Sequence, residues 1–192
     1  VLAAAPSAGA AAAAGPYPDR IVDYHLGGDA GFGEAFLPDN ILGPPSGNID
    51  TTQPEESAGE LLSLGNGGQI TLEYTDSRIM DGPGPDFIVF ENVFVPISSP
   101  DVRFIEAAVV AVSQDGDNFT TFTFDFVPDP EGAVGDPAQY IGFAGVNPTL
   151  SSPTNGIDPT DPGVAGGDAF DLADVGLPWI RFIRIVDTGM PG

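Results

Sequence analysis

The chain has 192 residues, and its 28 Asp and Glu against five Arg and no Lys give a formal net charge of −23. Such a charge excludes nucleic acid and anionic membrane surfaces as partners, although an Asp-rich, Lys-free surface is also typical of adaptation to high salt. There is no Cys and only one His, His25, which excludes disulfides and thiolate metal sites and argues against a zinc site or a Ser-His relay.

The first 15 residues, VLAAAPSAGAAAAAG, are uncharged and low in complexity. A stretch of small residues of this kind is typical of the remnant left when a secretory signal is removed, which predicts a protein outside the cytoplasm. On its own it should be a flexible tail, so an ordered tail must be packed against something. We predict an Ala-rich N-terminal arm over residues 1–17 and a β-sandwich domain over residues 18–192.

The domain alternates short apolar runs with turns. Its 26 Gly and 20 Pro, with high Thr, Val and Phe, predict many strands and little helix. A long loop over 28–53 is rich in Gly, Pro, Asn and Asp, and loops of this length are usually functional or pinned by an ion. The seven or eight candidate strands lie at residues 18–27, 60–64, 68–75, 87–90, 102–113, 119–127, 140–146 and 179–187.

These candidates predict an all-β fold, an antiparallel β-sandwich of jelly-roll type. The segments Gln69–Tyr74, Arg103–Val112 and Phe119–Phe126 are expected to be adjacent antiparallel strands. A single core is expected from six apolar residues, namely Phe87, Phe90, Val109, Phe122, Phe182 and Ile185. No apolar run approaches the roughly 20 residues of a membrane helix, so we expect no membrane insertion.

The stretch Asp81–Asn92, DGPGPDFIVFEN, is the centre of the chain. A turn of Asp, Gly and Pro leads into an apolar strand that ends at Glu91, so carboxylates lie at both ends of a core strand. They repel one another unless a positive charge lies between them, and the chain has few positive side chains. Oxygen ligands without His or Cys favour calcium, which takes six to eight oxygens. We therefore predict a calcium site that includes Asp81, Asp86 and Glu91.

A second acidic segment, GGDAFDLADVG, has Asp at every third position. This spacing predicts one turn of short helix held at the rim of the sandwich. One or more of its carboxylates are expected to complete the calcium site, from Asp168, Asp171 or Asp174.

A third acidic pair, Asp115 and Asp117, lies between two candidate strands. The pair could hold a cation, and the alternative is a plain hairpin turn fixed by the Asp-Gly dipeptide. For all the acidic candidates, the alternative to metal binding is that they cap turns and pair with arginine. Arg181 and Arg184 are expected to form such pairs.

Six motifs occur in order along the chain: GNGGQITLEY, DGPGPDFIVFEN, VAVSQDGDNF, GFAGVNP, DPTDPGVAGGDAFDLADVG and IRFIRIVD. This combination, over roughly residues 18–187, resembles a family of secreted bacterial cell-surface proteins with a galactose-binding-like, or discoidin-like, jelly roll. The resemblance implies an extracellular location, a β-sandwich and calcium, and it implies no reaction. Members usually continue beyond the segment matched by IRFIRIVD into another short strand, so we expect this sandwich to lack its final strand.

The leading hypothesis is a structural extracellular or cell-surface protein, a calcium-stabilised β-sandwich that assembles with copies of itself. The arm is expected to lie as a donated strand in a groove of the next copy, which produces a head-to-tail filament. The residues at its start are Val1, Leu2, Ala3, Ala4 and Ala5. The alternative is that the arm folds back on its own domain.

Two other functions are alternatives to assembly. A calcium-dependent carbohydrate-binding or adhesion module, with a glycan as partner, is the alternative, but Trp179 and the four Tyr lie mostly in strands where the core can use them. An enzyme such as a glycosidase needs a carboxylate pair, and the chain has no Lys or Cys and one His to support it. We expect no enzyme activity and no catalytic residues.

Overall fold

The computed structural model describes residues 3–6, 15–130 and 133–190, and for residues 3–6 only the backbone. The strands within these ranges are β1 Ala3–Pro6, β2 Arg20–His25, β3 Gln69–Glu73, β4 Ile79–Met80, β5 Phe87–Phe90, β6 Ala108–Ser113, β7 Thr120–Thr121, β8 Asp125–Phe126, β9 Tyr140–Ile141, β10 Asp168–Phe170, β11 Trp179–Ile180 and β12 Phe182–Asp187. The short 3-10 helices are η1 Glu34–Phe36, η2 Pro137–Gln139 and η3 Leu172–Val175. None of the described helices has the length and apolar character needed to cross a membrane.

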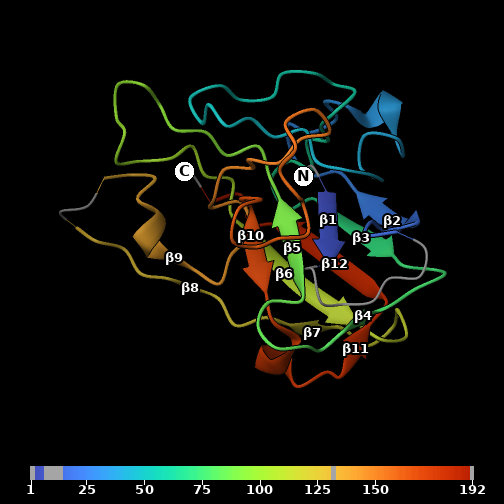
Figure 1. Ribbon diagram of the computed structural model, residues 1–192. Helices are drawn as coiled ribbons and strands as arrows, with labels where there is room; N and C mark the ends of the chain where they lie inside the picture. The colour runs from blue at the N-terminus through green and yellow to red at the C-terminus, as the bar shows by residue number, and fades with distance from the viewer. Residues whose placement is uncertain (1–2, 7–14, 131–132, 191–192) are drawn as a thin grey trace.

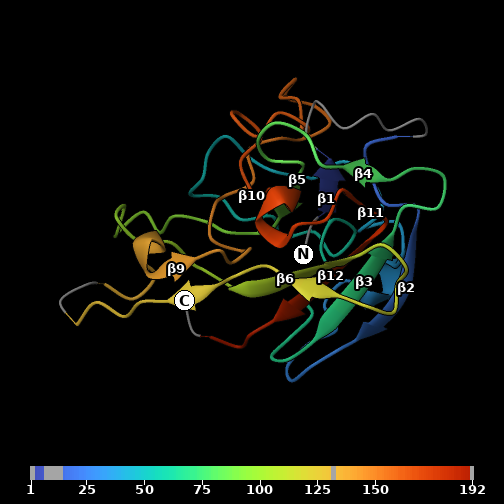
Figure 2. The ribbon, with the colours of Figure 1, turned by 90° about the horizontal axis from the view of Figure 1, so that it is seen from below.

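Two antiparallel sheets form two layers. A five-stranded sheet has the order β2-β3-β12-β6-β7, and a three-stranded sheet has the order β1-β5-β10. In Figure 1 the three-stranded sheet lies in front of β6, β12 and β3, and Figure 2 shows the same two layers from below. The small pairs β11-β4 and β8-β9 lie outside these sheets. The prediction of an all-β fold with antiparallel sheets is therefore confirmed, while the jelly-roll order stays a prediction.

Strand β5 is buried on both faces. Phe87 and Val89 belong to the main core, which they share with apolar residues of the five-stranded sheet. Ile88 and Phe90 point the other way, because successive side chains of a strand alternate, and they pack against Leu61 and Ala165 with Tyr17 beside them. All four side chains of β5 have no exposed surface.

The prediction of a single core was correct for three of its six members, Phe87, Phe122 and Ile185. Phe90 follows Phe87 by three residues, and an odd separation along a strand puts two side chains on opposite faces. The same period places Phe182 opposite to Ile185, and Phe182 is only half-buried. Val109 packs instead against a third cluster, outside the main core.

The expected order of the strands was wrong in one place. β3 and β6 are not neighbours, because β12 lies between them and pairs with both. The expected pairing of β6 with the following segment is present, with Val112 opposite Thr120, but that segment is broken into the short strands β7 and β8. The central strand of the sheet is thus the last strand in the described part of the chain.

We expect substitution of β5 to be costly. Phe87→Ala removes a ring that packs at 5.3 Å from Phe170 and 5.9 Å from Phe122, between ring centroids. The free energy of unfolding should fall by about 3–5 kcal/mol. Phe32→Ala is the matched control, because that ring is 50% exposed, and it should change stability by less than about 1 kcal/mol. Urea denaturation of both variants measures the difference, and equal losses would contradict the burial of β5.

Candidate metal centre

Three of the predicted ligands converge at one end of the three-stranded sheet. β10 pairs with β5 so that Phe170 lies opposite Phe87. Asp171 follows Phe170 and Asp86 precedes Phe87, so the two carboxylates become neighbours. The backbone N–H of Asp86 donates to the Phe170 carbonyl at 2.8 Å. Together with Asp81, each offers a carboxylate oxygen, and these oxygens all lie within 4.8 Å of one another.

Asp81 is positioned by the β4-β11 pair. Met80, at the end of β4, lies opposite Trp179 of β11. The next residue, Asp81, donates its backbone N–H to the Pro178 carbonyl at 3.1 Å. The Gly- and Pro-rich turn then returns the chain toward β5, and the Gly82 N–H donates to Oδ1 of Asp86 at 2.8 Å.

Close approach of β10 to β5 requires a glycine. Gly167 has φ of 71°, and a Cβ atom there would lie 2.7 Å from the Val89 carbonyl oxygen. Any larger residue would therefore push the start of β10 away from β5 and move Asp171 with it.

Asp86 is the most constrained of the three carboxylates. Its side chain is 2% exposed, and Oδ2 accepts the backbone N–H of Leu172 at 2.8 Å. Burial raises the pKa of Asp86, and the nearby charges of Asp171 and Asp81 raise it further against the lowering effect of its hydrogen bonds. Asp171 caps η3 by accepting the Ala173 N–H at 2.9 Å. Each of these two carboxylates is thus oriented by backbone N–H groups.

The ion pairs of the described arginines lie elsewhere. Arg20 and Arg181 approach Glu73 at 2.6 Å and 3.7 Å. The guanidinium of Arg184 lies 3.7 Å from the centre of the Phe119 ring, so its expected pairing with a carboxylate is replaced by a cation–π contact. Arg181 also donates to the Tyr74 and Thr75 carbonyls, and Arg184 donates to Oγ1 of Thr71. Arg78 lies over the ring of Trp179, and Arg103 donates to the Val146 carbonyl and to Asn147.

The arrangement can hold a metal ion. Three carboxylates on a fixed scaffold offer only oxygen ligands, which hard divalent cations prefer. An ion between them would offset the repulsion that the arginines leave uncompensated.

Three other predicted ligands lie away from this cluster. Asp168 is at the opposite end of β10, and three residues of extended chain separate its Cα from that of Asp171 by about 10 Å. The prediction had assumed a helical spacing for this segment. Glu91 lies beyond the far end of β5, where Oε2 accepts the Asn92 N–H at 3.0 Å. Asp174 is exposed on η3 and is not a member of the cluster.

Asp115 and Asp117 form a hairpin turn. Oδ1 of Asp115 accepts the backbone N–H groups of Asp117 at 3.0 Å and Asn118 at 2.8 Å. The hydrogen bonds from Asn118 and Asp117 hold the pKa of Asp115 well below its usual range. The alternative of a plain hairpin turn thus accounts for the contacts of Asp115.

The sequence did not predict the buried hydrogen-bond network around Asp168. Asp168 is buried, and its Oδ2 accepts the Val146 N–H at 2.9 Å while Oδ1 accepts Nδ2 of Asn147 at 2.6 Å. Arg103 joins this group by donating from Nη1 to the Val146 carbonyl at 2.9 Å. Only the GFAGVNP motif marked the region, because residues so far apart in sequence carry no local signal of their contact.

Comparisons with protein-family models, with curated proteins and with solved structures found no match for this chain.

Metal binding should be visible as stabilisation. Calcium, magnesium and manganese are titrated into chelator-treated protein, and at about 100 times Kd the bound ion adds about 2.7 kcal/mol to the free energy of unfolding. Asp81→Asn and Asp171→Asn should lose most of this gain, and Asn still caps a helix at position 171. Asp76→Asn, an exposed change of the same charge, should keep it. An equal gain in Tm for Asp171→Asn and the wild type would contradict the site.

The pH dependence of stability should include a contribution from Asp168. Burial raises the pKa of its carboxyl to about 6. The folded state therefore binds this proton more tightly than the unfolded state, so the contribution is present at about pH 4 and is lost as pH rises through about 6. The shift corresponds to about 3 kcal/mol at most.

Urea denaturation between pH 4.5 and 7.5, with chelator present, measures this slope. Asp168→Asn should flatten the decline over that window, whatever its absolute stability. Groups with lowered pKa, such as Asp50 and Asp158, act below this window and do not affect the comparison. An unchanged slope in Asp168→Asn would show that its carboxyl titrates normally.

Proposed function

We propose that this chain is a structural extracellular or cell-surface protein, a calcium-stabilised β-sandwich subunit that assembles head-to-tail into a filament by exchanging strand β1. The observation that carries the proposal is the place of β1. It covers one edge of β5, in the antiparallel register that puts Ala3 opposite Phe90 and Pro6 opposite Phe87.

Strand β5 needs a neighbour on that edge. Its four side chains are fully buried, and β10 covers only the other edge. Without β1, an apolar strand would expose a row of backbone N–H and C=O groups, which is a template for pairing with another chain. The domain is therefore complete only when a strand from the arm lies beside β5.

The arm can supply that strand to its own domain or to the next. In the single chain β1 pairs with its own β5. Residues 7–16 connect β1 to the sandwich, and ten extended residues reach at most about 36 Å. The same register can therefore form between two copies, and exchange of an identical element is a low-cost route to association. Donation from each copy to the next need not close into a ring, so a filament results.

Calcium fits the acidic cluster better than zinc or copper do, because the ligands are carboxylates without His or Cys. A cation that takes six to eight oxygens would need further oxygen ligands from backbone carbonyls or water. An ion at Asp81, Asp86 and Asp171 would tie β5 to β10 at one end. The bound ion would also reduce the repulsion between copies of charge −23. The extracellular location that the resemblance implies would expose the protein to calcium.

Cysteine cross-linking tests the exchange, since the chain has no Cys of its own. Ala4 and Val89 are partners in the β1-β5 register, and such a pair has a Cα separation suited to a disulfide. Chains with Ala4→Cys alone and Val89→Cys alone are refolded together in calcium and oxidised. Exchange predicts disulfide dimers from the mixture and a ladder of covalent oligomers from the doubly substituted chain.

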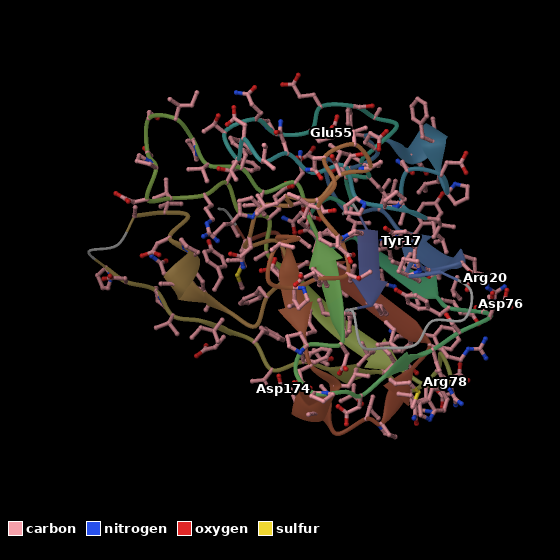
Figure 3. The ribbon with its side chains drawn as sticks, viewed as in Figure 1. Tyr17, Arg20, Glu55, Asp76, Arg78 and Asp174 are labelled. Atoms are coloured by element: carbon pink, nitrogen blue, oxygen red, sulfur yellow. The ribbon has the colours of Figure 1, made fainter. Side chains whose placement is uncertain are left out.

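Two controls complete the test. Ala4→Cys mixed with Asp76→Cys should give no dimers above background, because Asp76 lies far from β5 at the edge of the domain (Figure 3). Deletion of residues 1–15 should abolish filaments in negative-stain micrographs and in light scattering. A doubly substituted chain that closes only on itself, or filaments that survive the deletion, would refute donation of β1.

A further inference from the structure

A cavity of about 800 Å³ opens beside strand β10, and none of the three carboxylates of the metal centre lines it. Its walls come from β10, from the segment after β7, and from η2, β9 and the loop that follows. In both ribbon views the β8-β9 pair lies to one side of the sheets (Figures 1 and 2). The volume is within the range of about 300–1,000 Å³ typical of small-molecule sites.

Aromatic rings line much of this cavity: Phe122, Tyr140, Phe143 and Phe170. They form two contacting pairs, with centroids 4.9 Å apart for Phe122 and Phe170 and 6.1 Å apart for Tyr140 and Phe143. These contacts hold the four rings in place. Each of these residues is buried, with 3–6% of its surface exposed, so the rings form a fixed floor of the cavity with small exposed parts.

Two carboxylates share the cavity with these rings. Asp168 is buried in the wall and is oriented by the Val146 N–H and by the side chain of Asn147. Asp174 lies exposed on η3 (Figure 3), and it also lines the cavity. Neither is a member of the Asp81 cluster.

We propose that this cavity binds a small organic cation of the quaternary ammonium type, through its aromatic rings and the carboxylates of Asp168 and Asp174. An alkylated ammonium group is attracted to aromatic faces and costs little to desolvate. It also offsets the charge of a carboxylate that lies in an apolar wall. The inference stands whether or not copies of the chain exchange β1.

The charges disfavour an anion. Arg103 lines the cavity too, but its Nη1 donates to the Val146 carbonyl at 2.9 Å and to Oδ1 of Asn147 at 2.5 Å. One guanidinium engaged with the wall faces two carboxylates, in a chain whose net charge of −23 repels anions at longer range.

Choline and its uncharged carbon analogue 3,3-dimethylbutan-1-ol provide a matched pair of probes. Isothermal titration calorimetry at pH 7.5, in calcium that saturates the metal centre, should show choline binding at least about tenfold more tightly than the alcohol, because only the cation gains the aromatic and carboxylate attraction. Equal affinities for the two probes, or no binding of choline, would overturn the proposal.

Variants separate the cavity from general attraction to an acidic protein. Asp168→Asn should weaken choline at least about tenfold, and the exposed change Asp174→Asn, which keeps the fold, should weaken it about threefold. Asp76→Asn removes the same charge at a distant edge (Figure 3) and should leave affinity within about twofold. Equal losses in Asp76→Asn and Asp174→Asn would refute a specific site. A different result would be that choline does not bind, while glucose or galactose binds and this binding is lost in Asp174→Asn. That result would overturn the cation proposal and identify the ligand as a neutral polyol.

Discussion

Strand β5 has to be covered on both faces and along both edges, and the rest of the structure depends on this constraint. The five-stranded sheet covers Phe87 and Val89, while the loops around Leu61 and Ala165 cover Ile88 and Phe90. β10 and β1 complete the edges. Asp86 precedes the strand and Glu91 follows it. Because the four apolar side chains between them are buried, these two carboxylates lie at the boundary of the core. The acidic cluster is therefore a consequence of where β5 lies.

The outer strand β2 of the five-stranded sheet and the edge of β5 that faces β1 are protected in different ways. β2 ends the five-stranded sheet with a register shift between Ile21 and Asp23 and with exposed charged residues. Bulges and charges are the usual protection of an edge against unwanted pairing. β5 has neither, and its sequence FIVF offers no charge within the strand. Its protection on this edge is the short strand β1.

The sequence predicts those features that local pattern encodes. The Asp-Gly-Pro turn and the apolar strand after it identified Asp81 and Asp86, and the second acidic segment offered Asp168, Asp171 or Asp174 as a further ligand. Of these three, only Asp171 lies in the cluster, because the segment from Asp168 to Phe170 is extended and not helical. The central place of β12 and the contact of Asp168 with Asn147 depend on pairings between distant segments, which no local window contains.

The pairing of Met80 with Trp179 has a practical consequence. Trp179 is the one tryptophan of the chain, and its strand partner precedes Asp81 directly. Its indole also lies under the guanidinium of Arg78, at 5.1 Å. A change in the acidic turn therefore alters the surroundings of a single fluorophore, with no second indole to obscure it. Whether an ion binds at Asp81 can therefore be tested by intrinsic emission, or by energy transfer to a luminescent lanthanide, without any added label.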